Sequence, residues 1–353
     1  MAHNINTYIG RQAAWHKLGT VTGNYMTWAE ILAHGGLDFT VIKQQLEFQC
    51  VPVEAWGTFR SDNGVFLGAV GNWYTPINHA QGFELVDALV GSVDGAHYET
   101  AGVLGKGEKV WGLASLNQRI RIGGADDCNV YLLFSTSHDG SLAYNFRIVI
   151  ERVVCENTLG VALGEKTKAS FSIRHTSGAP KRIADCHQVL ANMGDDIKRV
   201  EDKLNFLADR KMTRETMTTV MDRLFPKRLK AGTDEPVSAT RRENILSDIL
   251  KIYEMNDGNA FPEQRGTAYN LLNAITNYTD HERSTQGDGR AESALFGSGD
   301  KLKTQAMEVL YEVAGALPAT ARPMTFATPT FTTIPAAITG VSLLDQVVES
   351  TIN

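Results

Sequence analysis

The amino-acid sequence predicts an α+β fold, in which an N-terminal domain with an antiparallel β-sheet and crossing helices precedes a helical C-terminal region. Apolar and polar residues alternate over about residues 38–75 and again over about 110–154, which is the period of half-buried strands. Short polar turns join these runs, and such short turns join antiparallel strands, because parallel strands need long crossovers. After about residue 180 the apolar spacing lengthens to three or four residues, the period of helices.

The first elements are marked by cap and turn residues. Thr27 with Glu30 forms a capping box ahead of a short helix, because the two side chains can satisfy each other's backbone N–H groups. Strand-like alternation follows, and residues 61–64 (Ser-Asp-Asn-Gly) predict a hairpin turn, since Asn-Gly tolerates positive φ. Asn78 is expected to cap a helix that stops at Gly91.

Four further segments read as strands of a second β block: 110–116, 120–122, 130–136 and 142–154. Within the last of these, Phe146, Ile148 and Ile150 share one face, as the two-residue period of a strand requires. Residues 126–127 and 138–140 are the expected connecting turns.

The C-terminal half predicts a series of helices. Apolar residues over 183–207 predict one long amphipathic helix, close to a heptad pattern. Thr213, Thr240 and Thr267 open later helices, and a fifth covers about 300–315. We therefore expect an α+β domain over 1–178, a helical region over 179–315 and a mobile Pro-, Thr- and Ala-rich tail over 316–353.

Composition sets limits on the kind of protein. The net charge of −6 gives no global sign of nucleic-acid or membrane binding, although residues 161–230 hold 15 Lys and Arg against 9 Asp and Glu. No apolar run approaches the roughly 18 residues of a membrane span. The four cysteines lack metal-site spacing, so we expect reduced thiols, no metal and no cofactor in a cytoplasmic protein.

Five segments in order resemble the phage/plasmid-like protein family of unknown function, which is encoded by bacteriophages and bacterial mobile elements. They are residues 15–19 (WHKLG), 70–76 (VGNWYTP), 137–159, 273–281 (NAITNYTDH) and 290–299. The resemblance covers most of the chain up to about residue 316. It implies a phage or plasmid origin and a location in the host bacterial cytoplasm, and it implies no activity.

Cys155 is the main candidate for an enzymatic reading. It follows a strand and precedes Asn157 and Thr158, which can cap a helix, and a helix N-terminus lowers a thiol pKa. Catalysis would also need a histidine placed by the fold, with His16, His138 or His175 as candidates. Since a capped strand-to-helix junction explains the same residues, we expect a protein that is not an enzyme.

Cationic residues near aromatic ones suggest that single-stranded DNA is the ligand, because phosphates attract cations and bases stack on aromatic rings. The predicted phosphate contacts are Arg119, Arg121, Arg147, Arg152, Lys166, Lys168 and Arg174. The predicted stacking residues are Trp73, Tyr74 and Tyr144. The phage resemblance extends this hypothesis to oligomeric proteins that anneal strands in recombination without ATP, by analogy of fold alone.

A non-enzymatic phage structural or assembly protein is the alternative. In that case the 183–207 helix would be a self-association seam, with Leu190, Ile197 and Leu204 in the contact. The acidic net charge favours this alternative, and both hypotheses predict a homo-oligomer.

Overall fold

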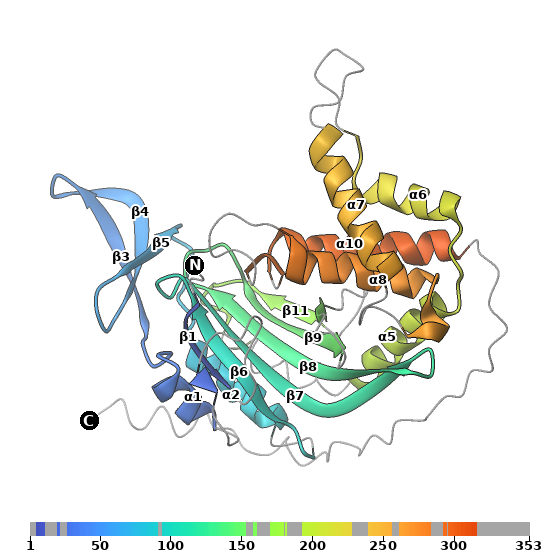
Figure 1. Ribbon diagram of the computed structural model, residues 1–353. Coiled ribbons are helices and arrows are strands. Elements are labelled where there is room, and N and C mark those ends of the chain that lie inside the picture. Colours follow the sequence, from blue (N-terminus) through green and yellow to red (C-terminus); the bar gives the residue numbers. More distant parts are fainter. Residues whose placement is uncertain are drawn as a thin grey trace.

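The computed structural model describes residues 5–10, 20–21, 27–90, 94–152, 158–160, 170–179, 181, 193–227, 239–255, 261–283, 292–294 and 296–315. A curved main sheet forms the centre of the molecule, a smaller sheet projects from one end, and the C-terminal helices lie at the other (Figure 1). The predicted α+β class is confirmed. No helix of the described part is long and apolar enough to cross a membrane.

The main sheet has the strand order β10-β9-β8-β7-β6-β1-β2, with β11 paired to the same β9. Its pairs are antiparallel except for the parallel pair β1–β2. The strands are β1 (Ile5–Gly10), β2 (Thr20–Val21), β6 (His97–Leu104), β7 (Lys109–Ile122), β8 (Asp126–Ser137), β9 (Tyr144–Arg152), β10 (Thr158–Gly160) and β11 (Ser170–Ile173).

Three local predictions for this sheet were wrong. Asp126 and Asp127 do not form the turn after β7, because they open β8 and pair with Ile122 and Arg121. The segments 110–116 and 120–122 belong to one strand, β7, in which the pairing to β8 shifts between Ser115 and Gln118 around Asn117 at φ +50°. Such a bulge bends a strand without ending it. Thr158 does not begin a helix, because it opens the short strand β10 and pairs with Glu151.

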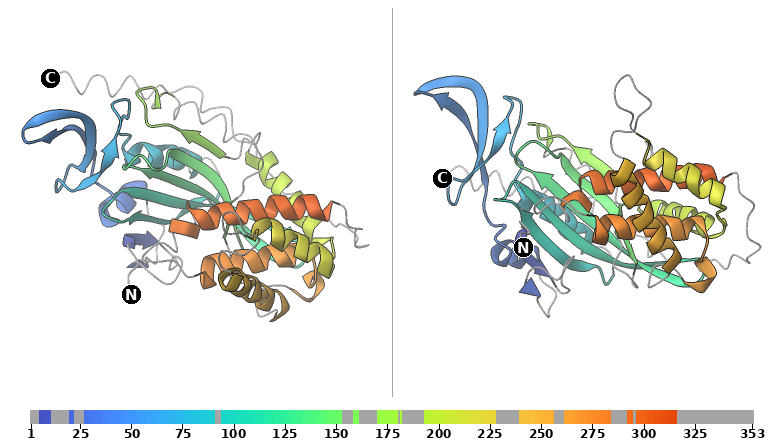
Figure 2. Two further views of the ribbon diagram at one scale, coloured as in Figure 1. Left: turned by 90° about the horizontal axis from the view of Figure 1, so that it is seen from above. Right: turned by 45° about the horizontal axis from the view of Figure 1, so that its top comes forward.

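The smaller sheet, which we call the arm, consists of β3 (Val41–Phe48), β4 (Val51–Arg60) and β5 (Phe66–Val70). It projects away from the body in all three ribbon views (Figures 1 and 2). The predicted 61–64 hairpin turn is confirmed, with Gly64 at φ +69° donating its N–H to the carbonyl of Arg60. A second tight turn, at Gln49 and Cys50, has positive φ at both residues.

Nine helical elements are defined among the described residues. They are α1 (Trp28–His34), α2 (His79–Val90), α5 (Met193–Ala208), α6 (Arg214–Leu224), α7 (Ala239–Met255), the 3-10 turn η2 (Pro262–Gln264), α8 (Ala268–Asn277) with its π-helical continuation η3 (Tyr278–Glu282), and α10 (Ser298–Ala314). The predicted caps at Thr27, Thr213 and Thr267 are confirmed by their side-chain hydrogen bonds.

One apolar core joins the sheet to helices on both sides of the predicted boundary near residue 178. It includes Phe83 of α2, Val130 of β8, Val200 of α5 and Leu271 of α8. The division into an α+β domain and a helical region therefore describes the order of elements along the chain. As a boundary between folding units it stays a prediction.

The apolar stripe of α5 packs into the core of the same chain. Ile197, Val200, Leu204 and Leu207 are at most 3% exposed and belong to the shared core. Because these side chains are buried in the core of the same chain, the described part of α5 presents no apolar stripe to a second copy. The predicted self-association surface is therefore not available there. Leu190 and the tail 316–353 lie outside the described residues.

Candidate functional site

The arm is anchored to the body at the turn between β8 and β9. Thr58 of β4 donates its hydroxyl hydrogen to the carbonyl of His138 at 2.6 Å. Gly68 of β5 lies so close to Asp139 that an added Cβ would stand 2.6 Å from the Asp139 Cα. The contact therefore depends on the missing side chain at position 68.

Three buried histidines gather beneath this contact. His79, His138 and His175 are 1%, 0% and 3% exposed. The rings of His79 and His138 are 5.8 Å apart between centroids, and the ring of His175 stacks on Tyr74 at 4.8 Å. His175 Nε2 also lies 3.0 Å from the Thr136 hydroxyl. We call these three residues the histidine cluster.

Burial keeps the histidine cluster neutral. It lowers the pKa of His79 to about 4 and that of His175 to about 4, and it lowers the pKa of His138 well below its ordinary value. Neither ring nitrogen of His138 has a hydrogen-bond partner among the described residues. His138 and His175 were candidates from the sequence, but His79 was not, because its place after Asn78, the predicted helix cap, carries no chemical signal.

The histidine cluster does not form a metal-ligand set with other residues in the described part of the chain. The described residues include no group of three or more His, Cys, Asp or Glu side chains that could hold a metal ion. The proposed nucleophile Cys155 and the candidate His16 lie outside the described residues. The enzymatic reading therefore gains no support from this arrangement.

An exposed surface borders the cluster at the base of the arm. The Thr75 N–H donates to the His175 carbonyl at 3.0 Å, which places the exposed residues Trp73 and Arg174 on adjoining segments. Trp73 is 67% exposed. Lys43 of β3 donates from Nζ to the carbonyls of Asn72 and Tyr74, at 2.7 and 2.8 Å. We call Lys43, Trp73 and Arg174 the arm-base surface.

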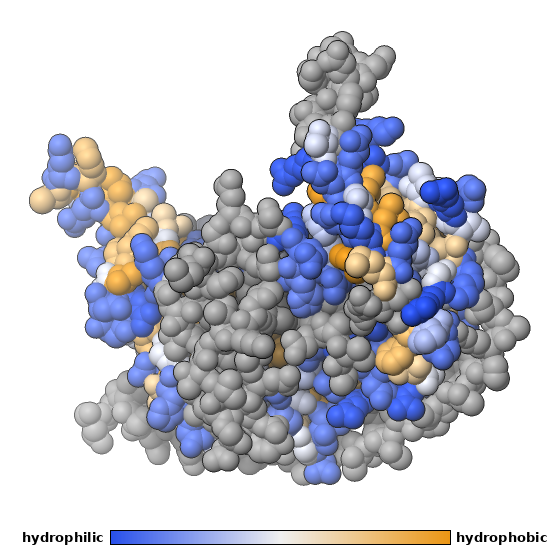
Figure 3. All heavy atoms as spheres, viewed as in Figure 1, coloured by the Kyte–Doolittle hydropathy of each residue, from blue (hydrophilic) through white to orange (hydrophobic). Residues whose placement is uncertain are grey.

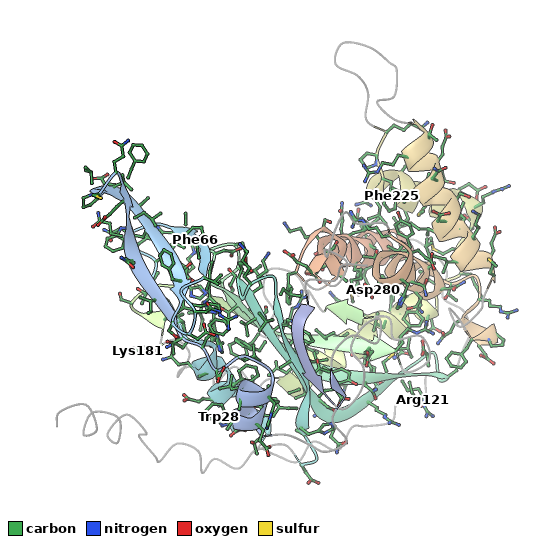
Figure 4. All side chains as sticks on the ribbon, turned by 60° about the vertical axis from the view of Figure 1, so that its left-hand side comes forward. Trp28, Phe66, Arg121, Lys181, Phe225 and Asp280 are labelled. Atoms are coloured by element: carbon green, nitrogen blue, oxygen red, sulfur yellow. The ribbon has the colours of Figure 1, made fainter. Side chains whose placement is uncertain are left out.

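Arg119 and Arg121 lie elsewhere. Both are exposed, but Arg121 forms an ion pair with Asp127 at 2.6 Å. They lie near the end of β7 opposite the arm, about 33 Å (Arg119) and about 40 Å (Arg121) along the strand from Lys109 at roughly 3.3 Å per residue. Figure 4 shows Arg121 and Phe66 of the arm on opposite sides of the molecule. The structure therefore does not bring these two arginines to the arm-base surface.

Arg147 and Arg152 are engaged in ion pairs inside the protein. Arg147 Nη1 lies 2.7 Å from a carboxylate oxygen of Asp300, at the start of α10. Arg152 is 3% exposed, and its Nε lies 2.6 Å from Asp126. Asp126 also accepts a hydrogen bond from the Tyr269 hydroxyl at 2.9 Å. These contacts tie the sheet to the C-terminal helices, so a phosphate-binding role does not fit Arg152.

Two of the predicted stacking residues are buried. Tyr74 is 2% exposed and donates to the Ser137 carbonyl, while Tyr144 is 0% exposed and donates to the Asn78 carbonyl. Neither ring has a free face for a base, because each contributes its apolar surface to packing at the arm base. Lys166 and Lys168 lie outside the described residues.

A family model described as a domain of unknown function (DUF932) matches residues 66–298. The chain belongs to the DUF932 family. The DUF932 region includes the histidine cluster, Trp73 and Arg174, whereas β3, β4 and Lys43 precede it. Neither a curated protein nor a solved structure matches the chain.

Proposed function

We propose that this DUF932 protein, of phage or plasmid origin, binds single-stranded DNA at the arm-base surface. The observation that carries the proposal is that the exposed Trp73 and the exposed Arg174 lie on adjoining segments, which the Thr75–His175 hydrogen bond joins. An exposed ring offers a face to any base, and a neighbouring cation offers a charge to the phosphate. Single strands fit this pair better than duplexes, whose bases are already stacked.

The surroundings of Trp73 support the proposal. Lys43 holds the backbone on both sides of Trp73 through the carbonyls of Asn72 and Tyr74. Tyr74 beneath is fixed by its stack on His175 and its bond to Ser137. A stacking ring on a fixed backbone loses less conformational entropy on binding than one on a free loop.

Strand annealing without ATP is the activity that we propose for this binding in a phage or plasmid protein. Annealing needs only that two complementary strands be held and brought together, so it requires no cofactor. The protein would bind in the cytoplasm of a bacterial host, as the resemblance to phage/plasmid-like proteins implies.

Two substitutions test the binding surface. Trp73→Ala should weaken binding of a labelled single-stranded oligonucleotide about 5- to 150-fold, since base stacking contributes about 1–3 kcal/mol. Arg174→Ala should weaken binding and reduce the salt dependence by about one phosphate contact. Fluorescence anisotropy measures both effects.

Arg119→Ala is the matched control, because it removes an exposed arginine from the opposite end of β7. It should leave the affinity unchanged. Equal losses in the Arg119 and Arg174 variants would mean that general charge drives binding, and an unchanged Trp73→Ala affinity would remove the stacking role. A strand-annealing assay with the same variants then tests the activity.

A further inference from the structure

The arm carries most of the exposed large apolar side chains of the described residues. Of eight such residues, Ile42, Phe48, Val51, Val53 and Phe66 lie on its three strands, and Trp73 follows directly after. Figure 3 shows this apolar surface on the projecting arm. Soluble proteins rarely leave a contiguous apolar patch uncovered unless it binds something.

The pairing register sorts the arm into two faces. Ile42 pairs with Phe59, Phe48 with Val51, and Phe59 with Phe66, so these side chains lie on one face. Gly57 places Leu46 on the same face, because an added Cβ would meet both Leu46 and the Phe59 ring. We call Ile42, Leu46, Phe48, Val51, Phe59 and Phe66 the apolar arm face.

The charged residues of these strands lie on the other face. Lys43 lies over the Trp56 ring at 4.7 Å, and Arg60 lies over the Phe39 ring at 3.8 Å. Strand pairing places Glu47 on that same side, since Glu47 pairs with Pro52, whereas Glu54 lies in the stretch of β4 where the pairing to β3 shifts. None of the residues that strand pairing places on the apolar arm face is charged.

We propose that the apolar arm face packs against the same face of a second copy of this chain. A two-fold interface brings each surface against itself, so an uncharged apolar face meets no like charge, whereas a charged face would repel its copy. The absence of cations on this face argues against nucleic acid as its occupant. Because the arm projects from the body (Figure 1), two arms can meet without contact between the bodies.

The area of the apolar arm face indicates how strong the proposed dimer should be. Eight residues of β3 span about 26 Å and three strands about 14 Å, which gives roughly 370 Å² in projection. A stable interface buries about 800 Å² on each partner. The expected dimer is therefore reversible and depends on protein concentration.

Sedimentation velocity of the full-length protein over a concentration series tests the proposal. The wild-type protein should shift from the 38.7 kDa monomer toward a dimer as concentration rises. The double variant Ile42→Lys and Phe48→Lys should weaken the dimer at least tenfold, because it places charges in an apolar contact. Both side chains are more than half exposed, so an unchanged circular dichroism spectrum should accompany the loss.

Met255→Lys is the matched control, since Met255 is 66% exposed at the end of α7, away from the arm. It should dimerise as the wild type does. If the wild-type protein is monomeric at every concentration, the proposal is overturned. The occupant of the face would then be another partner or the chain's own residues 316–353. A dimer that survives the double substitution would overturn it too, because its contact would lie elsewhere. Neither readout involves nucleic acid, so the outcome is independent of the proposed function.

Discussion

The imidazole of His138 lies 5.8 Å from that of His79 between ring centroids, and both rings are buried beneath the arm. Two protonated imidazoles at this separation would repel each other in surroundings that already disfavour charge. The pair is therefore compatible with the folded state only in its neutral form. Because His138 also carries the carbonyl that accepts from Thr58, the neutral cluster supports the attachment of the arm.

The folded protein should lose stability as the pH falls from about 6.5 toward 4. Burial lowers the pKa of His79 and of His175 to about 4, below the ordinary value of about 6.5. Between these values the unfolded chain binds more protons than the folded one, so the histidine contribution is complete above 6.5 and declines below it. At pH 5 each should cost about 2 kcal/mol. Urea unfolding at pH 7.5 and pH 5 measures the difference.

A His79→Gln variant is the control for this pH dependence, and it should show a smaller loss between the two pH values. Equal urea midpoints for the wild-type protein at pH 7.5 and pH 5 would show that the histidines do not carry the lowered pKa in solution.

Arg152→Met should destabilise the protein by about 3–5 kcal/mol, because it leaves the buried Asp126 carboxylate without its cation. Arg152 and Asp126 are 3% and 0% exposed. The comparison is Arg121→Met, which breaks the exposed pair with Asp127 and should change stability little. Chemical denaturation compares them, and similar losses in both would contradict the assigned burial of the Arg152 pair.

Gly68→Ala should separate the arm from the body. Its Cβ would stand 2.6 Å from the Asp139 Cα, and relieving such a backbone overlap costs about 1–3 kcal/mol. Gly178→Ala is the matched control, because no atom lies within 4 Å of the position of its Cβ. Thermal unfolding should show a lower midpoint for the first variant alone. Unfolding midpoints that coincide would mean that the arm base can shift without cost.

The sequence predicts the elements whose local signals agree with their burial. The caps at Thr27 and Thr213 and the turn at Gly64 follow from hydrogen bonding and φ within a few residues. Strand β6 gave no such signal, because positions 100–104 are all buried and show no alternation between faces. The turn at Gln49 and Cys50 was missed for a different reason, since neither residue is the glycine that positive φ favours.

The candidate site depends on contacts between residues that are far apart in the sequence, and local sequence patterns do not predict such contacts. Arg147 and Arg152 look like free cations in the sequence, but their partners Asp300 and Asp126 lie 153 and 26 residues away. Tyr74 looks like a neighbour of Trp73 with the same role, yet the two rings differ completely in exposure. Only the tertiary structure distinguishes a surface cation or ring from a buried one.

Anisotropy of labelled single-stranded and duplex oligonucleotides across a salt series tests the central claim of nucleic-acid binding most directly. We predict tighter binding of the single strand, with log affinity falling linearly as log salt concentration rises, by about 0.7 per phosphate contact. No binding of the single strand at low salt, or equal affinity for the duplex, would contradict the proposed function.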